Sequence, residues 1–91
     1  MKLFHCAIPE ARAVIGNEGL RTTREDGYIF AWSSFRAADA YRFEMNASGW
    51  ADIWEFDDRG RSEPSPGAND EAKVIGGDVP PDDLKLVYEA R

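Results

Sequence analysis

The stretch GYIFAWSSFRAADAY, residues 27–41, contains the change of pattern that sets the fold. Its first part, residues 28–32, is dense in aromatic side chains, which favours a buried β-strand. Two serines, Ser33 and Ser34, follow, and either of them can cap the N-terminus of a helix. The helix itself is predicted over residues 35–49. A strand that leads directly into a helix indicates a domain of mixed α and β structure.

The segments on either side extend this pattern. Residues 2–6 alternate in polarity and predict a first strand, which a helix follows between Pro9 and Gly19. A polar stretch over residues 57–70 predicts a mobile acidic loop. The remaining strands are predicted over residues 51–56, 71–76 and 84–90. The order is β-α-β-α-β-loop-β-β, so we expect an α+β domain in which the later strands pair antiparallel.

Length and composition indicate one domain, residues 1–91, with an apolar core: 43% of the residues are hydrophobic, including three Trp, five Phe and three Tyr. The formal net charge of -6 argues against direct nucleic-acid binding, which draws its affinity from Lys and Arg. A single cysteine gives no disulfide framework and favours a reducing compartment. No apolar run approaches the ~20 residues of a membrane span. We therefore expect a cytoplasmic protein without membrane contact.

His5 and Cys6 are the single histidine and the single cysteine of the chain. One imidazole and one thiol do not make a metal-ligand set, so no metal is expected. Adjacent positions of a strand point to opposite faces, so His5 is badly placed to deprotonate Cys6. A packed histidine bonded to backbone is the plain alternative to a functional one.

Three features follow one another along the chain. The predicted first strand contains a histidine (LFHC, residues 3–6), and the stretch at residues 27–41 comes next. An acidic residue then begins a late strand (NDEAKVIGGDVPPDDLKLV, residues 69–87). This order resembles the ADP-ribosyltransferase fold, in particular the diphtheria-toxin and poly(ADP-ribose) polymerase branch with its His-Tyr-Glu signature. The segment VPPDDLKLV also resembles the end of the related RNA 2′-phosphotransferases. The resemblance covers nearly the whole chain. It implies a small, mostly antiparallel split sheet with two helices, and NAD as a substrate.

The resemblance also implies roles. His5 would bond the adenosine ribose, Tyr41 would stack on the nicotinamide, and Glu71 would favour the positive charge that develops when the glycosidic bond breaks. Weaker alternatives to Glu71 are Glu63, Asp70 and Glu55. The residues that the resemblance brings to the nucleotide are His5, Cys6, Arg21, Tyr28, Ile29, Phe30 and Tyr41.

Two positions depart from the family pattern. Cys6 stands where the family has a glycine, so the backbone at this position loses the conformational freedom that glycine provides. The strand tyrosine, Tyr28, is displaced by one residue, which turns its ring to the other face of the sheet unless a bulge restores it. Either Tyr28 belongs to the core and Ile29 or Tyr41 faces the ligand, or Tyr28 itself does.

Three functions stay open at this point. The first is an enzyme that transfers ADP-ribose from NAD to a protein or small-molecule acceptor. The second is a catalytically inactive module on the same fold that binds NAD, ADP-ribose or a related nucleotide, or presents the cleft to a protein. The third is an acidic inhibitor that docks on a basic partner, for which the net charge and the loop at residues 57–70 are the support.

Overall fold

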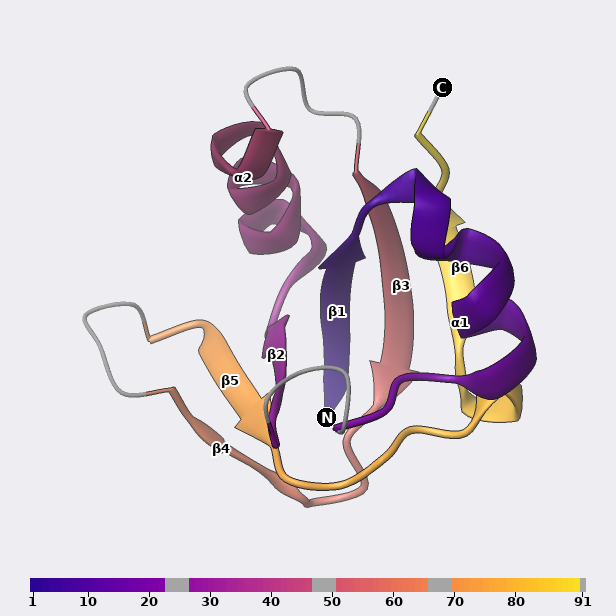
Figure 1. Ribbon diagram of the computed structural model, residues 1–91. Helices are drawn as coiled ribbons and strands as arrows, with labels where there is room; N and C mark the ends of the chain where they lie inside the picture. The colour runs from indigo at the N-terminus through magenta and orange to yellow at the C-terminus, as the bar shows by residue number, and fades with distance from the viewer. Residues whose placement is uncertain (23–26, 47–50, 66–69, 91) are drawn as a thin grey trace.

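The computed structural model describes residues 1–22, 27–46, 51–65 and 70–90 (Figure 1). Within these residues, six strands form one antiparallel sheet in the order β4-β5-β2-β1-β3-β6, together with two α-helices and two short 3₁₀ helices. This confirms the α+β class, the antiparallel pairing and the two helices. The elements are β1 (Lys2–Ala7), η1 (Pro9–Ala11), α1 (Arg12–Glu18), β2 (Ile29–Trp32), α2 (Phe35–Asn46), β3 (Asp52–Asp57), β4 (Ser62–Pro64), β5 (Ala72–Ile75), η2 (Pro81–Asp83) and β6 (Lys85–Tyr88).

The two helices cover opposite faces of the sheet. Alternation along β1 places Leu3 in one apolar cluster, which includes Ile15 of α1, and Cys6 in another, which includes Ala38 of α2. Helix α2 contacts β1, β2 and β3, while the outer strands β4 and β5 extend beyond it (Figure 1). In the described part of the chain, β4 and β5 therefore lie outside the main contact area of α2.

The start of α2 follows the predicted pattern. The Ser34 hydroxyl oxygen accepts a hydrogen bond from the Ala37 N–H at 3.1 Å, which is the cap expected for a serine before a helix. Ala38, one position further on, is fully buried. A small side chain at that position lets the helix lie close to β1.

Gly19 ends α1 for a steric reason. Its φ is +77°, and a Cβ atom there would lie 2.0 Å from the Val79 carbonyl oxygen. Leu20 and Val79 exchange two backbone hydrogen bonds, of 2.9 and 2.8 Å, directly beside it. Glycine is the residue that permits both the left-handed turn and this close approach.

The pairing between β1 and β2 is short, and we call this junction within the sheet the seam. These two strands share one register pair, Phe4 with Trp32, whereas β1 and β3 share six. The structure thus has a continuous sheet in place of the split sheet that the resemblance implies. It consists of two three-stranded halves, β4-β5-β2 and β1-β3-β6, that meet at the seam.

Two predictions about the backbone need correction. Residues 57–70 are not a loop throughout, because β3 continues to Asp57 and Ser62–Pro64 forms the edge strand β4; residues 66–69 of that segment lie outside the described ranges.

The aromatic strand, predicted to be buried, is only half buried, since Tyr28 and Phe30 are 53% and 55% exposed. They project from the part of the sheet that extends beyond α2. The predicted end of the second helix near residue 49 also lies outside the described residues.

No helix in the described part of the chain is both long enough and apolar enough to cross a membrane.

Candidate functional site

A cavity of about 310 Å³ lies at the seam and is lined by residues of β1, β2, β5 and α2. Four of the predicted site residues line it, and one of them, Tyr41, belongs to the helix. We call this cavity the seam cleft. Its lining consists of His5, Cys6, Phe30, Ala31, Trp32, Tyr41, Ser65, Ala72 and Lys73.

His5 bridges the seam. Its side chain is buried, and Nδ1 lies 2.6 Å from the Phe30 carbonyl oxygen on β2. A carbonyl oxygen only accepts, so Nδ1 carries the proton and the neutral ring is the Nδ1–H tautomer. The imidazole therefore holds the two halves of the sheet together at the point where the backbone ladder is weakest.

Cys6 is fixed as a thiol. Burial raises the pKa of Cys6 to about 12, and Sγ donates a hydrogen bond to the Ala38 carbonyl oxygen at 3.2 Å. A thiol with that pKa is not a nucleophile at neutral pH. Cys6 therefore contributes to the shape of the cleft and not to nucleophilic chemistry.

An aromatic pair forms the wall between the seam cleft and a neighbouring depression. The Trp32 and Tyr41 rings lie 5.1 Å apart between centroids, at an angle of 40°. Both residues line the cleft and also the depression, which has a similar volume of about 310 Å³. Tyr41 remains 38% exposed, so the edge of this wall is accessible to a ligand.

Glu71 lies on the far side of this wall, in the depression. Its carboxylate accepts hydrogen bonds from the hydroxyls of Ser34 at 2.6 Å and Ser33 at 3.4 Å. Its carbonyl oxygen also accepts the Ser33 N–H at 2.8 Å. These contacts hold the carboxylate at the beginning of α2. His5 and Glu71 are thus placed in two adjoining hollows that share Trp32 and Tyr41.

Three predicted ligand contacts lie elsewhere. Ile29 is fully buried within the α1-side core, which excludes direct contact with a ligand. Arg21 is exposed, pairs with Glu18 at 3.6 Å and does not line the seam cleft. Tyr28 is not in the core: it lines a different cavity at the outer part of the sheet.

Lys73 is a cleft residue that the sequence analysis did not single out. It is the one lysine or arginine among the described residues that line the cleft, in a chain with a formal net charge of -6. Lys73 reaches the cleft because β5 pairs with β2, with Lys73 opposite Ala31. No local pattern predicts which strands become neighbours, so the sequence held no signal for it.

No group of three or more His, Cys, Asp or Glu side chains able to hold a metal ion occurs among the described residues. No family model matches the chain, and comparison with curated proteins and with solved structures finds no significant match. The geometry alone therefore defines the class of site: an aromatic-walled cleft at a sheet seam, with one lysine and a nearby carboxylate.

Proposed function

We propose that the protein is an ADP-ribosyltransferase-like enzyme that binds NAD in the seam cleft and transfers ADP-ribose to a protein or small-molecule acceptor. The observation that carries this proposal is the position of Tyr41. Its ring, paired with Trp32, separates the hollow that contains His5 from the hollow that contains Glu71. A ligand that passes over the exposed edge of Tyr41 would extend into both hollows.

The size and polarity of the cleft suit one half of a dinucleotide. A volume of about 310 Å³ lies at the low end of the range for ligand cavities, roughly 300–1,000 Å³. The nicotinamide ring would stack on Tyr41, since aromatic faces prefer offset contacts with other planar rings. Lys73 would pair with a phosphate of the ligand, which supplies the positive charge that such a group requires.

The chemistry then depends on a fixed carboxylate. The C–N bond between nicotinamide and ribose breaks, nicotinamide leaves with the bonding electron pair, and positive charge develops at the anomeric carbon. Glu71 would stabilise that charge electrostatically while an acceptor oxygen or nitrogen attacks and loses its proton to solvent. The two serines that bond Glu71 would orient it before the reaction.

A binding module without catalysis is the second candidate, and two contacts favour it. The Glu71 carboxylate already accepts bonds from Ser33 and Ser34, and so fastens β5 to the start of α2. Cys6 adds a side chain where the family pattern has glycine. Both features are compatible with a cleft that holds NAD or ADP-ribose without cleaving NAD.

Incubation with NAD, followed by mass spectrometry of the products, separates the two candidates. The transferase releases nicotinamide, and Glu71→Gln abolishes the release while NAD still binds. Glu44→Gln is the matched control, because Glu44 lines the same depression from α2 and has no assigned role in the reaction. Saturable NAD binding without release by the wild-type protein identifies the binding module. Absence of NAD binding contradicts the transferase, and absence of ADP-ribose binding as well contradicts the binding module.

A further inference from the structure

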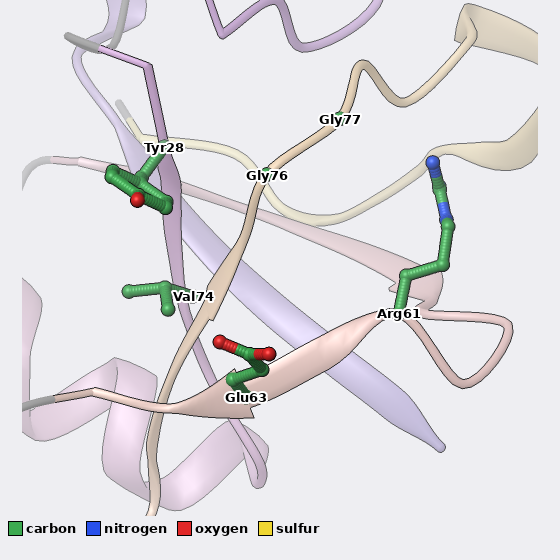
Figure 2. Close-up of a pocket in the computed structure, with 6 residues that line it drawn as sticks. All are labelled: Tyr28, Arg61, Glu63, Val74, Gly76 and Gly77. Carbon is green, nitrogen blue, oxygen red and sulfur yellow. The ribbon is translucent and has the colours of Figure 1, made fainter.

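A second cavity, of about 290 Å³, lies at the outer part of the sheet (Figure 2). It shares no lining residue with the seam cleft. The two cavities lie next to each other, because Val74 on β5 lines this cavity and its register partner Phe30 on β2 lines the cleft. We call it the edge cavity; it is lined by Tyr28, Arg61, Glu63, Val74, Gly76 and Gly77.

Arg61 is an oriented cation in this cavity. Its Nε donates to the Asp58 carbonyl oxygen at 3.4 Å and its Nη1 to the Asp78 carbonyl oxygen at 3.3 Å. Within the described ranges it forms no ion pair with a carboxylate, although acidic residues outnumber basic ones by 17 to 11. Figure 2 shows its side chain extending away from Glu63, toward the Gly77 side of the cavity. A guanidinium held by two carbonyls and not neutralised by an acid is suited to an anionic group, above all a phosphate.

Between the Tyr28 ring and the Arg61 guanidinium, the cavity is lined by the backbone of two glycines, Gly76 and Gly77. A Cβ atom at Gly76 would lie 3.9 Å from Cε1 of Tyr28, and one at Gly77 would lie 3.0 Å from Nη1 of Arg61. The ring and the guanidinium therefore lie against successive glycines. A ligand that bridges them can rest on the backbone, as glycine allows at sites of close approach.

The other two side chains complete the cavity. Glu63 and Val74 are register partners on β4 and β5, so they lie side by side. Val74 provides an apolar surface, and Glu63 provides an exposed carboxylate that can accept hydrogen bonds from hydroxyl or amino groups. Tyr28, which is 53% exposed, offers a ring face to a planar ligand.

We propose that the edge cavity is a binding site for a nucleoside phosphate. The base stacks on Tyr28, the ribose hydroxyls bond to the Glu63 carboxylate, and the phosphate bonds to Arg61. Carboxylates bind ribose hydroxyls in the same way at other nucleotide sites. A free phosphate would leave Tyr28 unused, and an apolar ligand would leave Arg61 unused. The inference rests on residues outside the seam cleft and does not depend on the proposed function.

Titration of the ¹⁵N-labelled protein with AMP tests the proposal, with the amide signals of Gly76 and Gly77 as the readout. These signals are expected to shift saturably. Adenosine without the phosphate is expected to bind at least tenfold more weakly. Arg61→Gln, a change on an exposed side chain, is expected to weaken AMP binding at least tenfold without lowering Tm.

Gly76→Ala provides an independent variant, because it adds a methyl group to the floor at ordinary contact distance from Tyr28. We expect it to fold and to bind AMP more weakly. Gly16→Ala is the matched control: apart from its own stretch of helix, nothing lies within 4 Å of the added methyl, so AMP affinity is expected to stay at the wild-type value. The proposal is overturned if Gly76 and Gly77 do not respond, if Arg61→Gln binds AMP like the wild type, or if inorganic phosphate binds as tightly as AMP. Shifts confined to the seam cleft also overturn it, while leaving the proposed function in place.

Discussion

The strongest prediction about stability concerns one arginine that binds two carboxylates in different surroundings. Arg12 donates from Nε and Nη2 to Asp52, at 2.9 and 2.8 Å, and from Nη1 to Glu89 at 2.9 Å. Asp52 is fully buried and also accepts the Ala90 N–H at 2.8 Å, whereas the Glu89 side chain is 62% exposed. Asp52 thus fastens the beginning of β3 both to α1 and to the segment that follows β6.

Asp52→Ala is expected to destabilise the protein strongly. The change removes the acceptor of Arg12 Nε and of the Ala90 N–H, and one of the two acceptors of Nη2, which also donates to the Ala90 carbonyl oxygen at 3.1 Å. Removing one member of a buried pair typically costs about 3–5 kcal/mol, and we expect the lower end of this range because the Arg12 side chain is 32% exposed. A chain of this length has a free energy of unfolding of about 5–14 kcal/mol, so the loss is a large part of the total. Tm is expected to fall by at least about 12 °C. Glu89→Ala removes the exposed partner of the same arginine and is expected to cost no more than about 1 kcal/mol.

Urea unfolding followed by tryptophan fluorescence measures both variants under the same conditions. Asp52→Asn, which keeps an acceptor oxygen, should fall between the wild type and Asp52→Ala. Two outcomes would refute the reasoning: a loss below about 1 kcal/mol for Asp52→Ala, or equal losses for Asp52→Ala and Glu89→Ala. The second would mean that burial does not decide the strength of this pair.

Three further predictions concern acid stability, the turn after α1 and the seam. The Ser62 hydroxyl, which donates to the Asp58 carboxylate, is the main cause that lowers the pKa of Asp58 to about 2. Since the pKa is lowered in the folded state, this contribution is present above about pH 4 and is lost as the pH falls through 2. Ser62→Ala should therefore lower the urea midpoint at pH 7 and make its decline below pH 4 shallower; an unchanged acid profile would contradict this. Gly19→Ala should cost more than about 2 kcal/mol, because of the positive φ and the 2.0 Å approach to Val79; thermal unfolding measures it, and a wild-type Tm would show that the turn relaxes. His5→Ala should weaken NAD binding at least tenfold in calorimetry, provided that circular dichroism shows a folded protein; unchanged affinity would remove His5 from the site.

The sequence was sufficient where local chemistry decides the structure. Gly19 stops α1, Ser34 caps α2, and the alternation along β1 separates Leu3 from Cys6. Each of these follows from a single residue type in a short pattern. The α+β class and the presence of two helices could be predicted from such signals alone.

Features that depend on tertiary neighbours could not be predicted. β4 is a polar edge strand, so it has no apolar alternation to indicate it. Ile29 is buried because it faces the α1-side core, whereas Phe30 is exposed because it lies on the other face, at a part of the sheet beyond α2. No local pattern records either circumstance. Lys73 reached the seam cleft through the pairing of β5 with β2.

Some residues of the candidate site could likewise be predicted from the sequence, and others could not. His5 and Tyr41 could be proposed from their order in the chain, and the structure places both in the lining of the seam cleft. Their roles toward a nucleotide remain predictions. Arg21 was an equally reasonable candidate from the sequence, but its position beyond α1 leaves it paired with Glu18.

The edge strand β4 has a consequence for self-association. An unpaired strand at the side of a sheet is a template for a strand from another molecule, and proteins commonly blunt it with short length, charge or proline. Ser62–Pro64 has all three properties: three residues, a glutamate at its centre, and a proline that offers no N–H at its end. Fibril growth by strand addition is therefore disfavoured on this side of the molecule, and we expect concentrated samples to resist it there.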